Sequence, residues 1–166
     1  VRRGMAAFGD DATAALCFGG ENTSTNMIVD TEIWNGSSWT ETSNLNAGAY
    51  SAGGIGATYT AGLCVSGRNL DASPNVTTLP KNESWNGSSW TEIANVNTGT
   101  FDMAAAGTQT SGLKGGGYPT IANTEIWNGS SWTEVNDLNV ARGSLSGSGS
   151  SIAALAIGGA PTPLAA

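Results

Sequence analysis

The chain has 166 residues, of which only 11% are charged, 24 are glycine and none is histidine. This shortage of Lys, Glu and Arg excludes a bundle of long helices, which depends on such residues. The formal charge of −7 disfavours a nucleic-acid partner. The lack of histidine excludes a Ser-His-Asp triad or a His-ligated metal, and no apolar run approaches the roughly 18 residues of a membrane span, so we expect no membrane insertion.

Four short strands are expected within the first 42 residues. We assign strand A to residues 4–8, strand B to 14–18, strand C to 30–34 and strand D to 38–42. Asn35-Gly36 separates strands C and D, and Asn-Gly is a strong hairpin signal because both residues tolerate a positive φ. Two connections remain open: a two-residue turn would place Trp34 opposite Ser37, whereas a four-residue loop would place it opposite Trp39.

The same segments recur along the chain. Residues 31–41 are repeated without change at 124–134, with a close copy at 82–92. The strand B element and its terminal glycines occur four times, at starts 47, 50 and 42 residues apart. Such periods are typical of propeller blades or helical repeats, and the Asn-Gly turns reject helices. The sequence predicts about 14 antiparallel strands in three four-stranded blades and a half blade, at about 2–46, 47–97, 98–139 and 140–166.

These landmarks resemble kelch-type repeats over nearly the whole chain. A glycine pair ends strand B, an aromatic residue ends strand C and a tryptophan opens strand D. The three sets are Gly19-Gly20, Trp34 and Trp39; Ser66-Gly67, Trp85 and Trp90; and Gly116-Gly117, Trp127 and Trp132. The chain departs from kelch at Ser66 and in having Trp where kelch strand C usually has Tyr. The Asn-Gly-Ser-Ser-Trp repeat is also similar to arrays in phage and marine metagenomic virion-associated proteins. The resemblance implies an all-β, kelch-like β-propeller, incomplete in this chain, with a binding role.

All the length variation among the repeats lies in the B–C connection. The distance from the strand B glycines to the strand C Trp is 14, 18 and 10 residues, while the distance from the strand D Trp to the next glycines is 28, 27 and 27. Variable loops on a fixed scaffold often carry binding specificity, although drift in unconstrained loops would give the same pattern. We expect any ligand at the end formed by the B–C and D–A connections. The candidate residues are Asn26, Asp30, Arg68, Asn69, Asp71, Lys81 and Tyr118.

The six tryptophans permit two interpretations, a sugar-binding ladder or packing between blades. We favour packing for Trp34, Trp39, Trp85, Trp90, Trp127 and Trp132, because each ring has a large area to bury. The strand D members are expected to be largely buried against an adjacent blade. Cys17 and Cys64 occupy equivalent strand B positions, and we expect both to be free because adjacent blades are too far apart for a disulfide. No aspartate spacing matches a calcium loop, so no metal site is predicted.

Together these features predict a non-enzymatic binding or structural protein without a cofactor. The leading hypothesis is a phage virion appendage, such as a tail fibre, spike or surface decoration, that contacts a host-surface glycan, other virion proteins or copies of itself. The alternative is a secreted or cell-surface bacterial adhesin or glycan-binding module. A kelch-containing oxidase is excluded because its copper site needs histidine. Three and a half blades do not close a ring, so we expect either further blades in a longer chain or assembly of several chains.

Overall fold

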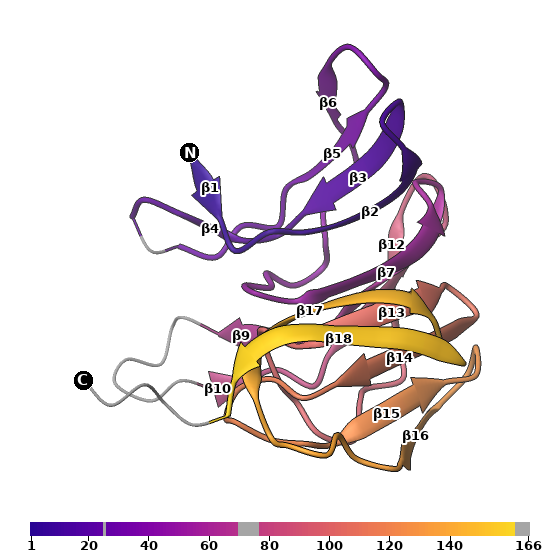
Figure 1. Cartoon of the computed structure of the whole chain (residues 1–166). Coiled ribbons are helices and arrows are strands. Elements are labelled where there is room, and N and C mark those ends of the chain that lie inside the picture. Colours follow the sequence, from indigo (N-terminus) through magenta and orange to yellow (C-terminus); the bar gives the residue numbers. More distant parts are fainter. Residues whose placement is uncertain (25, 70–76, 162–166) are drawn as a thin grey trace.

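The computed structural model describes residues 1–24, 26–69 and 77–161, and within these the protein is all-β (Figure 1). Three four-stranded antiparallel sheets and a two-stranded hairpin follow one another along the chain. Sheet 1 contains β2 (Ala6–Asp11), β3 (Ala14–Phe18), β5 (Thr31–Trp34) and β6 (Trp39–Glu41); sheet 2 contains β7 (Gly53–Thr58), β8 (Ala61–Val65), β11 (Asn82–Trp85) and β12 (Trp90–Ile93); sheet 3 contains β13 (Ala104–Thr108), β14 (Ser111–Gly115), β15 (Thr124–Trp127) and β16 (Trp132–Val135); the C-terminal hairpin contains β17 (Gly143–Ser150) and β18 (Ala153–Ala160).

The four strands of each sheet are ordered as in the chain, so each sheet is a meander. The sheets and the hairpin account for fourteen of the strands in the described residues, as the sequence predicts. Four further strands of two residues each lie in the connections: β1 (Arg2–Arg3), β4 (Glu21–Asn22), β9 (Arg68–Asn69) and β10 (Thr77–Thr78). The first long strand starts at Ala6 rather than at the expected residue 4, because Gly4 has a φ of 62° and belongs to a turn.

The turn between strands C and D is the four-residue loop. Trp34 is the register partner of Trp39, and the same pairing recurs in sheets 2 and 3. The Asn35 side-chain oxygen accepts hydrogen bonds from the backbone N–H groups of Ser37 and Ser38, each at 3.0 Å. Gly36 has a φ of 91°, which a side chain would disfavour. Local turn chemistry therefore sets the register that places two tryptophans side by side.

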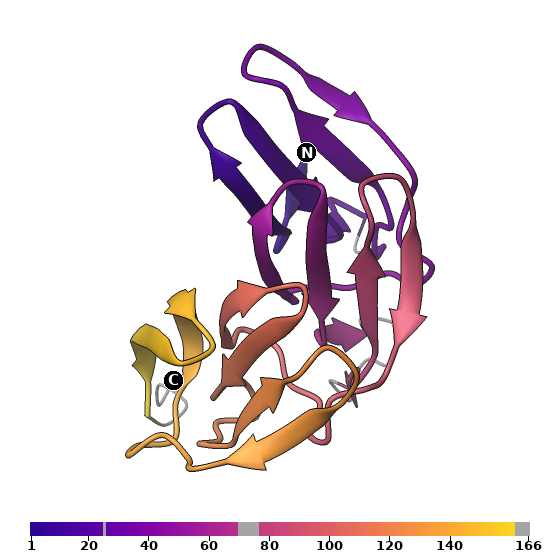
Figure 2. The same ribbon diagram turned by 90° about the vertical axis from the view of Figure 1, so that its right-hand side faces the viewer.

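The sheets stack through their first strands, which lie next to one another in the order β2, β7, β13 and β17. Figure 2 shows the resulting open arc, with the C-terminal hairpin at one end. Backbone hydrogen bonds link the starts of these strands: Ser51 N–H donates to Gly4 O at 2.9 Å and Asp102 N–H to Ser51 O at 3.0 Å. A Cβ on Gly54 would lie 2.5 Å from Ala7 O, so the close approach needs glycine there. The described residues do not close a ring.

Two apolar clusters fill the spaces between neighbouring sheets. The first joins residues of sheets 1 and 2, with the Phe18 and Trp90 rings 4.8 Å apart. The second joins Ile55 and Leu63 of sheet 2 to the tryptophans of sheet 3. Both faces of sheet 2 are therefore covered, which explains why the sequence lacks the simple polar–apolar alternation of a half-exposed sheet.

The burial of the strand D tryptophans follows this stacking. Trp90 and Trp132 are each only 6% exposed and face the preceding sheet, as predicted. The prediction that Trp39 is buried is wrong: it is 49% exposed, because no sheet among the described residues precedes sheet 1. The strand C tryptophans have a different role, since each indole N–H donates to a carbonyl of the A–B turn in its own sheet. Both cysteines are buried and free, as expected.

Candidate functional site

The B–C and D–A connections meet at one end of the stack. Where each strand B ends, a backbone N–H donates to a carbonyl of the D–A connection that follows: Gly20 to Ala49 at 2.8 Å, and Gly67 to Thr100 at 2.9 Å. Gly117 makes the third bond of this kind. The B–C and D–A connections are therefore hydrogen-bonded to each other at this end, where the sequence predicts a ligand site.

An arginine and three aromatic side chains form a continuous group at this end. Arg68 forms an isolated bridge with Tyr50, and Tyr118 forms one with Phe101. The Arg68 guanidinium carbon lies 4.4 Å from the Tyr50 ring centroid and 5.2 Å from that of Phe101. The Phe101 and Tyr118 rings are 4.9 Å apart. We call Tyr50, Arg68, Phe101 and Tyr118 the Arg68 cluster.

Unusual backbone conformations position two of the aromatic members of the cluster, Tyr50 and Phe101. Tyr50 and Phe101 are each followed by a residue with positive φ, Ser51 at 53° and Asp102 at 51°, where the chain turns into strand A. The Tyr50 ring lies against Gly4, where an added Cβ would come within 2.7 Å of a ring carbon. Glycine at position 4 thus provides both the turn and the space for the Tyr50 ring.

The cluster has a buried base and an exposed edge. Phe101 is buried, whereas Tyr118 is 44% exposed. Arg68 is partly buried, and its Nε has no hydrogen-bond partner among the described residues. A guanidinium held between ring faces gains cation–π stabilisation and keeps its donors in a fixed plane. The arrangement can stack an exposed ring on an apolar surface and donate hydrogen bonds to hydroxyl or carboxylate oxygens.

The other predicted B–C residues lie apart from this cluster. Asn26 N–H donates to the Asn22 side chain within its own turn, and Lys81, just before β11, pairs at 3.4 Å with Glu92 on β12. The backbone carbonyl of Asp30 accepts a hydrogen bond from Arg2. Asn69 follows Arg68 in β9, and Asp71 lies outside the described residues. Of the residues predicted from sequence, the structure brings Arg68 and Tyr118 together.

Two members of the cluster, Tyr50 and Phe101, are absent from the sequence-based candidates. Both lie in D–A connections, which the sequence already places at the same end as the B–C connections. The missed signal is therefore an aromatic residue directly before strand A in two successive repeats. Length variation pointed only to the B–C connections, and these D–A residues sit in a segment of nearly constant length.

A buried ion pair lies between sheets 2 and 3. Lys114 and Glu125 are 3.1 Å apart with side chains at most 1% exposed, and Lys114 also donates to Thr98 O at 2.7 Å. Burial lowers the pKa of Lys114. Burial would raise the pKa of Glu125, but hydrogen bonds from the backbone of Asn97 and Thr98, and the charge of Lys114, outweigh it and the pKa is lowered. Because the pair is closed to solvent, its role is structural.

Among residues 1–24, 26–69 and 77–161, no three potential metal-ligating side chains gather into one group. The same ranges contain no helix that could span a membrane. Comparisons of the chain with protein-family models and with curated proteins give no match.

Proposed function

We propose that the chain is part of a kelch-like β-propeller whose B–C end binds a ligand without catalysing a reaction. The observation that carries this proposal is the Arg68 cluster, which combines an exposed Tyr118 ring with a partly buried guanidinium. Three successive meander sheets with recurring glycines and tryptophan pairs support the propeller assignment. The sheets provide a rigid base, and the connections provide the variable binding surface.

The ligand class that fits the cluster best is a glycan. Sugar rings carry an apolar C–H face that can stack on an aromatic ring, and hydroxyl groups that accept hydrogen bonds from a guanidinium. The net charge of −7 disfavours long polyanions such as nucleic acids. One exposed ring and one arginine would give a weak single site, and weak sites become effective when many copies act together.

We place this binding protein in a phage virion appendage, where it would contact a host-surface glycan or another virion protein. The Asn-Gly-Ser-Ser-Trp repeat supports the placement through its similarity to virion-associated arrays, and repeated copies on a virion would supply the multivalency that a weak site needs. A secreted or cell-surface bacterial adhesin would use the same cluster with the same ligand chemistry.

The test is a glycan array probed with the full chain, followed by titration of each bound sugar. Arg68→Ala and Tyr118→Ala should each weaken binding about tenfold, as expected for loss of a charged hydrogen bond or a stacked ring. Lys81→Ala is the matched control, because it removes an exposed B–C cation outside the cluster. Thermal melting of each variant checks the fold. If no glycan binds, or if binding survives both cluster substitutions, the proposal fails.

A further inference from the structure

The strand C glutamates of sheets 2 and 3 make the same contact with the D–A connection that precedes their sheet. Glu83 Oε2 accepts hydrogen bonds from Asn46 N–H at 2.9 Å and Asn46 Nδ2 at 2.8 Å, and Glu83 Oε1 accepts one from Ala47 N–H at 2.9 Å. The Glu125 carboxylate repeats all three contacts with the connection before sheet 3. Both glutamates are buried, so two equivalent carboxylates can be compared in closely matched surroundings.

Glu125 has, in addition, a cationic partner. Lys114 Nζ lies 3.1 Å from Glu125 Oε1 and donates a hydrogen bond to Thr98 O at 2.7 Å. The strand C glutamate of sheet 1, Glu32, pairs with the guanidinium of Arg2. In two of the three sheets, the chain itself therefore supplies a positive charge to this glutamate.

Glu83 has no such partner. All six Lys and Arg residues of the sequence belong to the part of the chain that the structure describes, and none of them forms an ion pair with Glu83. Cys64 takes the position that Lys114 has in sheet 3, as the register partner of the glutamate. Lys81 is close in sequence, but its exposed ammonium pairs with Glu92. A buried carboxylate without a positive partner is costly.

A small cavity lies beside Glu83. Its volume is about 10 Å³, which is about enough for one water-sized occupant, and Ala47, Cys64 and Glu83 are among its lining residues. Ala47 O is the equivalent of Thr98 O, the carbonyl that accepts from Lys114, because Ala47 and Thr98 make the same contact with their glutamates. Burial, and to a smaller extent the charge of Glu83, raise the pKa of the Cys64 thiol, so the thiol stays neutral. The cavity therefore has a single negative charge beside it.

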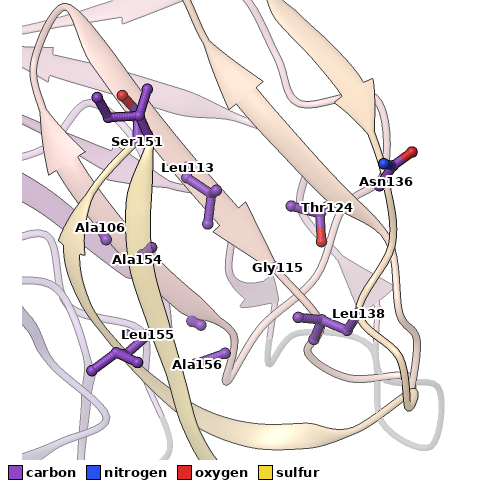
Figure 3. Close-up of a pocket in the computed structure, with 14 residues that line it drawn as sticks. Ala106, Leu113, Gly115, Thr124, Asn136, Leu138, Ser151, Ala154, Leu155 and Ala156 are labelled. Carbon is purple, nitrogen blue, oxygen red and sulfur yellow. The ribbon is translucent and has the colours of Figure 1, made fainter.

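The larger cavity between sheet 3 and the C-terminal hairpin has a different lining. It measures about 230 Å³, and Figure 3 shows Leu113 and Leu138 on one side of it and Ala154 on the hairpin side. None of the described residues that line it is charged. A cavity of this kind favours apolar occupants, whereas the carboxylate beside the smaller cavity favours a cation.

We propose that the cavity beside Glu83 binds one monovalent alkali cation, K⁺ or Na⁺, through Glu83 Oε1 and the Ala47 carbonyl. The ion takes the place that the Lys114 ammonium has in sheet 3 and carries the same single charge. Carbonyl and carboxylate oxygens can replace part of the hydration shell of such an ion. A divalent ion fits less well, because Ca²⁺ and Mg²⁺ need about six or more oxygen ligands. The role of the ion is structural, since it neutralises a buried charge and joins the D–A connection to sheet 2.

Thermal unfolding of the full chain in different chloride salts tests the site. The midpoint is measured in KCl, NaCl and tetramethylammonium chloride at equal concentration, so that general screening by salt is the same. Tetramethylammonium is too large for a cavity of about 10 Å³. We expect a midpoint about 2–4 °C higher in KCl or NaCl, because an ion that binds only the folded chain stabilises it. The salt that gives the higher midpoint identifies the preferred ion.

Cys64→Lys is the decisive variant, because it gives sheet 2 the residue that sheet 3 has at this position. Its ammonium takes the place of the ion, so the difference in midpoint between the salts should be lost. Cys64→Ala is the matched control: it keeps Glu83 and the cavity, and the difference should persist. If Cys64→Lys does not fold, Glu83→Gln gives the same test, since it removes the charge that binds the ion.

Equal midpoints of the wild type in all three salts would overturn the proposal, because the cavity would then hold water or no ion. A difference that persists in Cys64→Lys would also overturn it, since the ion would then act elsewhere on the chain. Glycan binding at the Arg68 cluster uses other residues, so neither result affects the proposed function.

Discussion

Residues 31–41 and 124–134 have the same sequence but occupy different environments. Both form a hairpin in which the two tryptophans pair, with ring centroids 5.5 Å apart in each. In the second copy Trp132 is 6% exposed and Glu125 is buried among donors from the preceding connection. In the first copy Trp39 is 49% exposed, and Glu32 has Arg2 as its one ion-pair partner among the described residues. The comparison separates what a segment does by itself from what a neighbouring sheet adds.

The C-terminal hairpin shows the same dependence of burial on a neighbouring sheet, here for a strand B leucine. Leu63 is fully buried because sheet 3 covers it, whereas its equivalent Leu155 is 67% exposed in β18. Burial here depends on the next sheet along the stack, as expected for a repeat architecture in which each unit contacts only its neighbours. Within the described residues, Trp39 and Leu155 are exposed at positions that a neighbouring sheet covers elsewhere in the stack.

The largest difference between the two copies should come from the strand D tryptophans. Trp132→Ala removes a buried ring from the sheet 2–sheet 3 interface and should cost about 3–5 kcal/mol of unfolding free energy. Trp39→Ala removes an exposed ring of identical local sequence and should cost less than about 1 kcal/mol. Urea denaturation measures both, and equal losses would mean that the tryptophans stabilise only their own hairpins.

The glutamates give the next comparison. Glu125→Gln leaves the Lys114 ammonium buried without its charge partner and should cost about 3 kcal/mol. Glu32→Gln breaks a partly exposed pair and should cost at most about 1 kcal/mol. Adding Lys114→Cys to Glu125→Gln should recover part of the loss, because sheet 2 has Cys64 at the equivalent position beside Glu83. A double variant that is no more stable than Glu125→Gln would contradict this explanation.

The pH dependence of the unfolding free energy tests the contribution of the Lys114–Glu125 ion pair. The folded-state pKa of Glu125 is lowered below the ordinary value of 4.5, so its contribution is present above that value and is lost as pH falls through the folded pKa. The stability difference between the wild type and Glu125→Gln should therefore shrink under acid, measured by denaturation at stepped pH. Burial also lowers the pKa of folded Lys114 below its ordinary value of 10.5. The folded protein therefore loses this proton before the unfolded chain does, and the stability cost of burying the charge is relieved as the pH rises from the folded pKa towards 10.5.

The smallest effect is expected for the asparagines that face the glutamates. Asn97→Ala removes the side-chain donor to Glu125 and should cost about 1–2 kcal/mol. Asn139→Ala changes the asparagine at the equivalent position after sheet 3, which makes no hydrogen bond to a carboxylate of the described residues, and should alter stability by less than about 0.5 kcal/mol. Thermal melting of the two variants gives the comparison. A similar loss for both would show that the asparagines act within their own connections.

Much of the fold and half of the candidate site can be predicted from the sequence. The repeats and turn residues predict the all-β class, the four-stranded units and the shared end of the B–C and D–A connections. Arg68 and Tyr118 follow from loop-length variation, but Tyr50 and Phe101 do not, because their role depends on contacts across three sheets. Sequence spacing describes one repeat at a time, so it does not show which side chains of neighbouring connections meet.

The sequence by itself determined the hairpins, because an Asn side chain and a positive-φ glycine act within four residues of the chain. It left open whether the turn has two or four residues, since both satisfy the Asn-Gly preference. Only the tertiary structure decided which tryptophans and glutamates are buried, as the identical segments 31–41 and 124–134 demonstrate. The physical reason is that burial and desolvation depend on the atoms of the adjacent sheet, which the local sequence does not specify.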